Sequence, residues 1–473
     1  MLTAEGAARP AAAAVVQHIN ELGPSELRVR QLHADVEILT QGITFTVYSD
    51  GRGVDRAWPF DVIPRVIDAG EWRRTERGLA QRMRALNAFI DDVYNDQRAI
   101  KDGVFPSALL EKSVNYRPEC RGVQPAFGVW AHISGCDVVR DADGTMYVLE
   151  DNLRVPSGAS YVLENRSLSK IVFADLFERQ SVLPVDSYPD ELGKVLCSLR
   201  PDRNEPTIVV LTPGIYNSAY FEHAYLAASM GAELVEGRDL FVGDDGYVYV
   251  HAVGGPERVD VIYRRVDDLF LDPMVFRPDS TLGVPGLMQA WRDGKVAIAN
   301  CPGSGVADDK AVYAWVPDFI RYYLGEEPLV PNVPTWRCLD PVECAFVLDN
   351  LRDLVVKPAN ESGGYGIVIG DRATDDELAK AATAIKNDPR NWVAQPILSL
   401  SVVPTLCDDA VEPRHVDLRP FVLSGESVYV TPGGLTRVAR RKGSLVVNSS
   451  QGGGSKDTWV IDTAHPAPGS AVA

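Results

Sequence analysis

The most restrictive feature of the sequence is an apolar run that ends in a cluster of polar side chains. Residues 148–158 read VLEDNLRVPSG, so a run typical of a buried strand leads directly into Glu150, Asp151 and Asn152. The preceding residues, DVVRDADG at 137–144, predict a second strand and a two-residue turn at Asp143 and Gly144. We therefore expect a hairpin whose second strand ends in carboxylates.

The predicted turn sets which side chains of the hairpin face each other. It places Asp137 directly across from Glu150, with Asn152 on the same face and Asp151 on the other. Like charges directly opposite each other destabilise a hairpin, and a divalent cation removes that objection. Carboxylate and amide oxygens suit Mg²⁺, which fills its shell with water and substrate phosphates. The alternative is a solvated strand end whose acids never meet.

Bulk composition narrows the function classes. A chain of 473 residues is expected to form two to four packed subdomains. It has no run of eighteen apolar residues, so no membrane span is predicted, and its net charge of −18 disfavours nucleic acid as a partner. The start of the chain lacks the features of a signal peptide, and the seven cysteines form no C-x-x-C pair. These features predict a cytoplasmic protein with free thiols.

The chain divides into segments of different character. The residues from Glu71 to Tyr94 have apolar side chains at three- and four-residue steps and predict an amphipathic helix. The predicted segments are a helical region over 1–115, the hairpin and a following helix over 116–200, an open α/β unit over 201–345, a block around a glycine-rich loop over 346–400, a strand-rich block over 401–465, and a disordered tail over 466–473.

Candidate phosphate-binding residues lie in the last third of the chain. Lys357 ends an apolar run, and the loop from Gly363 to Gly366 could bring backbone N–H groups close to phosphates, although an ordinary turn is the alternative. Arg419 lies within a strand pattern, where a guanidinium is costly unless an anion pairs with it. Arg437 belongs to a basic run that could equally be a solvated face. No Walker A sequence occurs.

Taken together, these motifs resemble the ATP-grasp superfamily, and specifically its circularly permuted branch, which is similar to the synthetase domain of glutathionylspermidine synthase. The resemblance implies an α/β (α+β) ATP-grasp fold, with a helical N-terminal region and an open α/β subdomain added. Ordinary ATP-grasp chains run lysine, lid, hinge and then magnesium hairpin, whereas here the hairpin comes first. Permutation explains this order if the hairpin packs beside the strands of DLRPFVL, residues 417–423.

The resemblance also implies ATP and Mg²⁺ as cofactors and assigns a set of site residues. Asp137, Glu150 and Asn152 match the metal ligands. Lys357, Arg419 and Arg437 would offset charge on the transferred phosphoryl group, and Arg154 would hold the acceptor carboxylate. The residues expected to bind nucleotide are Lys310, Lys357, Gly363, Gly364, Tyr365, Gly366, Gln395, Pro396, Ile397 and Arg419.

The implied reaction is carboxylate–amine ligation through an acyl phosphate, with a small-molecule carboxylate and a small-molecule amine as substrates. Two alternatives stay open at this point. The chain could be a catalytically silent nucleotide-binding scaffold that works with a partner protein, or a small-molecule phosphotransferase. The sequence assigns no role to the charged residues Arg264, Arg265, Asp267 and Asp268.

Overall fold

The computed structural model describes residues 1–3, 6–49, 52–141, 143–359, 366–408, 410–444, 447 and 453–464. The fold combines helices and sheets, as the sequence predicts. The helices are α1 (Ala13–Gln41), α2 (Ala69–Tyr94), α3 (Arg98–Lys101), α4 (Ser107–Glu111), α5 (Ala159–Val172), α6 (Ala174–Glu178), α7 (Tyr188–Ser198), α8 (Tyr220–Met230), α9 (Asp268–Leu271), α10 (Leu287–Arg292), α11 (Lys310–Tyr313), α12 (Val316–Phe319), α13 (Pro341–Asp349) and α14 (Asp375–Asn387).

The strands form one large sheet and several small ones. They are β1 (Thr44–Ser49), β2 (Arg52–Ala57), β3 (Phe60–Asp68), β4 (Ile133–Arg140), β5 (Met146–Asn152), β6 (Ile208–Leu211), β7 (Glu233–Val235), β8 (Leu240–Val242), β9 (Val248–Ala252), β10 (Gly255–Val259), β11 (Val261–Arg264), β12 (Ala297–Ala299), β13 (Trp336–Arg337), β14 (Leu354–Pro358), β15 (Val368–Ile369), β16 (Trp392–Pro396), β17 (Val402–Cys407), β18 (Ala410–Arg419), β19 (Phe421–Ser424), β20 (Val428–Val430), β21 (Leu435–Val438) and β22 (Gly454–Ile461).

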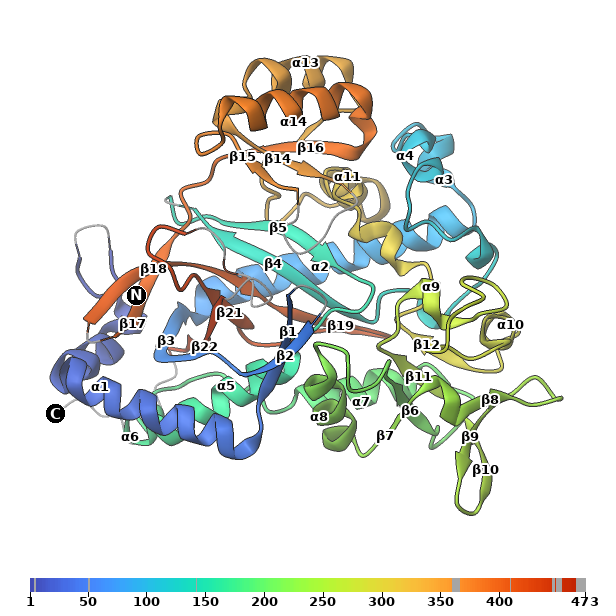
Figure 1. Ribbon diagram of the computed structural model, residues 1–473, viewed down its shortest axis with the longest axis horizontal. Coiled ribbons are helices and arrows are strands. Elements are labelled where there is room, and N and C mark those ends of the chain that lie inside the picture. The colour runs from blue at the N-terminus through green and yellow to red at the C-terminus, as the bar shows by residue number, and fades with distance from the viewer. Residues whose placement is uncertain are drawn as a thin grey trace.

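The large sheet brings the hairpin into the C-terminal part of the chain. Its order is β20-β19-β4-β18-β21-β22-β3, with β5 paired to β4 and β17 paired to β18. Strand β4 lies between β18 and β19, so the predicted packing of the hairpin beside residues 417–423 is confirmed. In Figure 1 the teal hairpin lies next to the orange-red strands of the last part of the chain.

Helices cover both faces of this sheet. Helix α2 begins after Asp68, whose carboxylate accepts hydrogen bonds from the backbone N–H groups of Gly70 and Glu71. Its predicted apolar stripe is fully buried and packs with Val138, Leu418 and other residues of one sheet face. Helices α1 and α5 pack against the other face.

The region predicted to be helical also contributes strands. Strand β3 joins the large sheet and runs parallel to β22. Side chains on both faces of this nine-residue strand are mostly buried. Its sequence, FDVIPRVID, therefore lacks the polar–apolar alternation that marks a half-exposed strand.

The open α/β unit contains a parallel sheet of order β12-β11-β6-β7. As predicted, strand β6 is followed by a glycine-containing turn, helix α8 and strand β7. The unassigned arginines prove to be buried here: Arg264 pairs with Asp268 at 2.7 Å, and Arg265 pairs with Glu222 at 3.0 Å. Arg264 bonds within the subdomain, to the carbonyls of Asn300 and Cys301, whereas Arg265 also contacts the segment that follows β5, because its Nη1 donates to the Pro156 carbonyl.

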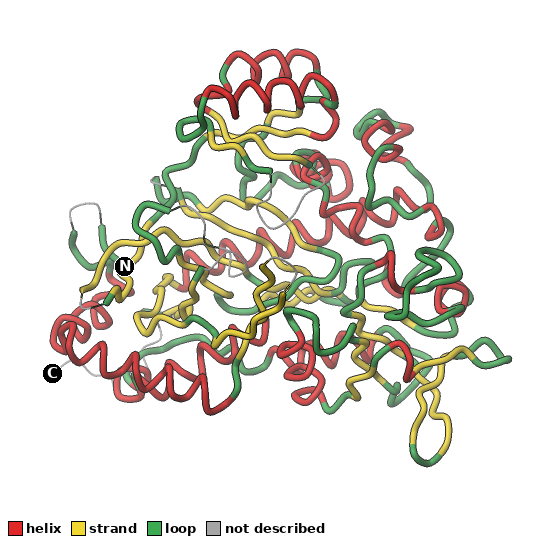
Figure 2. The backbone as a smooth tube through the Cα atoms, viewed as in Figure 1, coloured by secondary structure: helices red, strands yellow, loops and turns green. Residues whose placement is uncertain are grey.

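A small lobe stands apart from the large sheet. Strands β13-β16-β14-β15 form an antiparallel sheet, and helices α13 and α14 cover its outer side (Figure 2). This lobe has a hydrophobic core of its own that includes Val347, Val356 and Ile385. Strands β14 and β15 pair as the sequence predicts, whereas most of the glycine-rich loop between them lies outside the described residues. The tail predicted at 466–473 also lies outside them.

None of the helices in the described part of the chain combines the length and the apolar character that a membrane span requires. All seven cysteines are among the residues that the structure describes, and all are free thiols.

Candidate nucleotide and metal site

The turn of the hairpin differs from the prediction, but its strands meet in the predicted register at the acids. Near the turn the opposed pairs are Arg140 with Met146 and Val138 with Val148, which is inconsistent with a two-residue turn. The backbone N–H of Asp141 donates to the Thr145 carbonyl at 3.0 Å, so the turn is longer than predicted.

A β-bulge then restores the register. It lies between Val138 and Asp137, and Leu149 is the extra residue on β5. Beyond it, Asp137 pairs with Glu150, as predicted. The prediction of a two-residue turn was therefore wrong, whereas the predicted pairing of the two acids is confirmed because the two errors cancel.

Asp137 lies at the centre of a group of arginines on the large sheet. Arg419 Nε and Nη2 contact its two carboxylate oxygens at 2.5 and 2.9 Å, and Arg437 Nη2 contacts Oδ2 at 2.6 Å. Arg437 is also paired with Asp417. Burial opposes the charge on Asp137, but the two guanidiniums outweigh it and hold its pKa well below the usual range. Asp137 therefore keeps its negative charge at neutral pH.

Glu150 differs from Asp137 in its titration. Burial and the neighbouring Asp137 raise the pKa of Glu150, although Lys310 Nζ and Arg419 Nη2 lie 3.9 and 4.0 Å away. The two acids are opposed across the hairpin, and the charge of Asp137 is one cause of the raised pKa of Glu150.

This carboxyl pair fits a divalent cation, because a cation bound by both acids would offset the repulsion between two opposed negative charges. Asn152 completes the set, since its Nδ2 donates to the Gly135 carbonyl at 3.3 Å and leaves Oδ1 for a cation. Among the described residues, no group of three or more histidine, cysteine or acidic side chains is placed to hold a metal. Two acids and an amide suit Mg²⁺, which takes its other ligands from water and phosphates.

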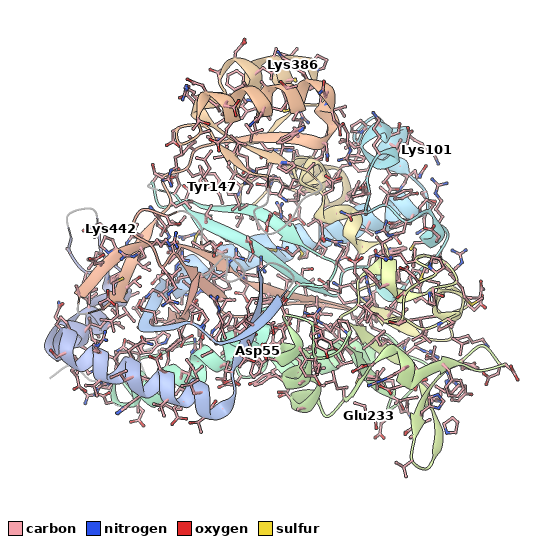
Figure 3. All side chains as sticks on the ribbon, in the orientation of Figure 1. Asp55, Lys101, Tyr147, Glu233, Lys386 and Lys442 are labelled. Carbon is pink, nitrogen blue, oxygen red and sulfur yellow. The ribbon has the colours of Figure 1, made fainter. Side chains whose placement is uncertain are left out.

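Lys357 enters the site from the small lobe. Its side chain is nearly buried on β14, and its Nζ donates to Gln395 Oε1 at 2.5 Å. Burial lowers the pKa of Lys357 to about 8, and the charge of Lys310 acts in the same direction, while Glu150 and Asp137 oppose it. Figure 3 shows the two parts that meet here, with Tyr147 on the hairpin below and Lys386 on the small lobe above.

The other predicted site residues vary in how well they fit. Lys310 begins α11 as expected, after the N-cap residue Asp309. Gln395 and Pro396 end β16 and Ile397 follows it, where the hinge is expected. Of the lid residues, Gly363, Gly364 and Tyr365 lie outside the described residues, and Gly366 adopts a left-handed φ of 72° beside Pro358.

Arg154 is already engaged by two carboxylates. Its Nε contacts Asp308 at 2.8 Å and its Nη1 contacts Asp267 at 3.0 Å. Gly305 packs so closely against this side chain that a Cβ there would be 2.2 Å from Arg154 Cδ. An acceptor carboxylate would have to compete with both acids, so the role of Arg154 as a carboxylate-binding residue stays a prediction.

Sequence reasoning missed several residues that hold the site. Asp417 shares a strand face with Arg419, and the alternation in VDLR could have identified it. Arg82 and Thr335 contact the site from α2 and from the segment before β13, and no local pattern marks either residue.

Comparison with known proteins establishes the family to which this chain belongs. The model of the circularly permuted ATP-grasp type 2 family matches residues 64–439, and the chain is a member of that family. It is 56% identical over 460 residues to an "Uncharacterized protein" of Synechocystis sp., with 97% of this chain and 95% of that protein covered.

Two further similarities bear on function and fold. A Frankia casuarinae protein named "Putative glutamate--cysteine ligase 2-2" is 43% identical over 97% of this chain, which spans only 53% of that protein. The structure of a glutathione synthetase-like effector from Globodera pallida, in apo form, matches with a TM-score of 0.60 and 12% identity. It covers 93% of this chain and 98% of the effector, and at that identity it supports the fold alone.

Proposed function

We propose that the protein is an ATP- and magnesium-dependent carboxylate–amine ligase that acts through an acyl phosphate. One observation carries this proposal: the opposed carboxyls of Asp137 and Glu150 lie on the large sheet with Lys310 Nζ 3.9 Å from Glu150, and their charges act on Lys357 of the small lobe. Family membership supports ATP-dependent ligation. The "ligase" in the Frankia name supports it less directly, because about half of that protein has no counterpart here.

The chain's own residues would act by positioning and by charge neutralisation. Asp137, Glu150 and Asn152 would hold Mg²⁺, which would offset the negative charge of the triphosphate when bound. Arg419 is half-buried and lies on the same sheet face, where it would neutralise charge on the transferred phosphoryl group. Lys357 would do so from the small lobe.

The two chemical steps require groups that exclude water. A substrate carboxylate oxygen attacks the γ-phosphorus and the bond to the β-phosphate oxygen breaks, giving ADP and an acyl phosphate. The amine then attacks the acyl carbon, loses a proton and displaces inorganic phosphate. Closure of the small lobe would protect the acyl phosphate from hydrolysis. A cytoplasmic location is part of the proposal and is supported by the free thiols.

The test is release of ADP and inorganic phosphate from ATP and Mg²⁺ in an extract of cytoplasmic small molecules. We expect both products in equal amounts, and we expect Glu150→Gln and Lys357→Ala to abolish them while circular dichroism remains native. Arg352→Ala serves as a matched control, because Arg352 is exposed and pairs on the outer side of the small lobe with Asp375.

Each other result favours a different function. ADP without free phosphate would indicate a phosphotransferase. Nucleotide binding without either product would indicate the silent scaffold. Product release that persists in Glu150→Gln would contradict the assignment of the metal site. We also propose that the protein is similar to glutathionylspermidine synthase. Fractionation of the active extract would test this by identifying the carboxylate and amine substrates.

A further inference from the structure

The strand that carries Glu150 and Asn152 is held from behind by a buried arginine. Arg82 of α2 donates three hydrogen bonds of 2.5 to 3.0 Å to the carboxylate of Asp151. Both side chains are almost completely buried. Because Asp151 lies between the two predicted metal ligands in the chain, its anchoring fixes the position of both.

The same arginine contacts the segment that leads into the small lobe, residues 325–335, here called the lobe linker. Arg82 Nη1 donates to Asn332 Oδ1 at 2.5 Å. The lobe linker also lies along the edge of β5, since Val148 N donates to the Pro331 carbonyl at 3.0 Å and Val333 N donates to the Val148 carbonyl at 3.1 Å. The entry to the small lobe is therefore fastened to the metal strand by backbone and side chain together.

The lobe linker is in turn bonded to the phosphate lysine. Thr335 Oγ1 donates to the Val333 carbonyl at 2.7 Å and accepts from Gln395 Nε2 at 3.0 Å. With its Nε2 fixed in this way, Gln395 must present Oε1 to the ammonium of Lys357, which donates to it at 2.5 Å. A series of hydrogen bonds, joined through the backbone between Asn332 and Val333, thus connects Asp151 with Lys357.

We infer that Thr335 and Arg82 are positioning residues: through Gln395 and Asp151 they fix the ammonium of Lys357 relative to the carboxyl pair that would hold the metal. This inference rests on the proposed function. Its physical basis is the two-sided amide of Gln395. Without the Thr335 hydroxyl the amide can rotate, and its N–H₂ group would then face the ammonium, donor against donor. Mg-ATP needs the carboxyl pair for its metal and the ammonium of Lys357 for its phosphates. It would bind less tightly if the ammonium were no longer held in position.

The first measurement is the dissociation constant of Mg-ATP by isothermal titration calorimetry on the full chain. We expect Thr335→Val, which removes the hydroxyl at nearly constant volume, to weaken binding about tenfold, the effect of roughly one oriented hydrogen bond to a charged site. Thr335→Ser keeps the hydroxyl and should restore wild-type affinity. Thr383→Val is the matched control, because Thr383 is exposed on α14 and its hydroxyl bonds only to the Ala379 carbonyl within the described residues.

The second measurement is a double-mutant cycle between Arg82 and Thr335. Arg82→Lys keeps a positive charge beside Asp151, but the shorter side chain no longer reaches Asn332. If the residues act as one chain, Arg82→Lys should weaken Mg-ATP binding by less than about twofold in the Thr335→Val background, although it weakens binding more in the wild type. If Arg82→Lys does not fold, Asn332→Ala breaks the same link without disturbing Asp151.

The outcomes separate the two levels of the proposal. Wild-type affinity in Thr335→Val would overturn the inference and leave the proposed function standing. Additive effects in the cycle would also overturn it, because they would show two independent local contacts. Absence of Mg-ATP binding by the wild-type chain would overturn the proposed function and this inference with it.

Discussion

The affinity for Mg-ATP should fall as the pH rises through about 8. Burial lowers the pKa of Lys357 to about 8, from an ordinary value near 10.5. If the ammonium form binds the phosphates, the charged fraction of the ligand-free protein sets the affinity. That fraction is about 91% at pH 7 and about 9% at pH 9, so the dissociation constant should increase about tenfold between them.

Stability should change in the opposite direction to affinity, because it should increase as the pH rises. The folded protein disfavours the lysine's charge, so it binds fewer protons than the unfolded chain between about pH 8 and 10.5. The contribution of Lys357 to stability is therefore unfavourable by about 3 kcal/mol below pH 8, and it recovers as the pH rises through that window. Bound phosphates would offset the unfavourable burial of the ammonium group. Binding of Mg-ATP should therefore stabilise the charged form of Lys357.

Calorimetric titration of Mg-ATP at pH 7, 8 and 9, in two buffers of different ionisation enthalpy, measures both the affinity and the protons taken up. We expect close to one proton taken up per nucleotide at pH 9 and almost none at pH 7. Lys357→Arg should abolish this dependence because a guanidinium stays charged throughout the range. An affinity independent of pH in the wild type, or an equal decline in Lys357→Arg, would refute the reasoning.

Two further predictions concern stability in urea. Gly305→Ala should lower the free energy of unfolding by about 1 to 3 kcal/mol, because its Cβ would be 2.2 Å from Arg154 Cδ and the arginine would have to leave its acids; an unchanged midpoint would mean that Arg154 moves at no cost. Asp137→Asn should lower it by about 3 to 5 kcal/mol, since Arg419 and Arg437 lose a buried counter-charge. Because the folded pKa of Asp137 is depressed, the wild type should lose this advantage as the pH falls from about 4 toward 2, and parallel pH profiles for the two proteins would contradict the assignment.

Much of the fold followed from local patterns in the sequence. The helix at 69–94 has apolar residues at three- and four-residue steps, and apolar runs mark the two strands on either side of the glycine-rich loop. Strand β3 was missed because a strand buried on both faces has no alternation, and its neighbour β22 lies far away in the sequence. Local composition says nothing of such a pairing.

The candidate site was predictable where it depends on strand registers and unpredictable where it depends on distant contacts. The alternation of side chains placed Glu150 and Asn152 on one face and Asp151 on the other. The bulge at Leu149 was not foreseeable, because no residue in MYVLEDN requires it. The partners of Arg154 come from segments more than one hundred residues away, so its engagement by Asp308 and Asp267 could not be read from its neighbours.

The parallel pairing of β3 with β22 has a consequence for the newly made chain. The two strands begin at Phe60 and Gly454, so at about 5 to 20 residues per second the second strand is made roughly 20 to 80 s after the first. Until then the edge of β3 has no partner, while the small lobe, whose core lies within residues 338–394, can already be complete. We expect the nascent chain to expose an unpaired strand edge during this interval, which makes the N-terminal segment the part most in need of a chaperone.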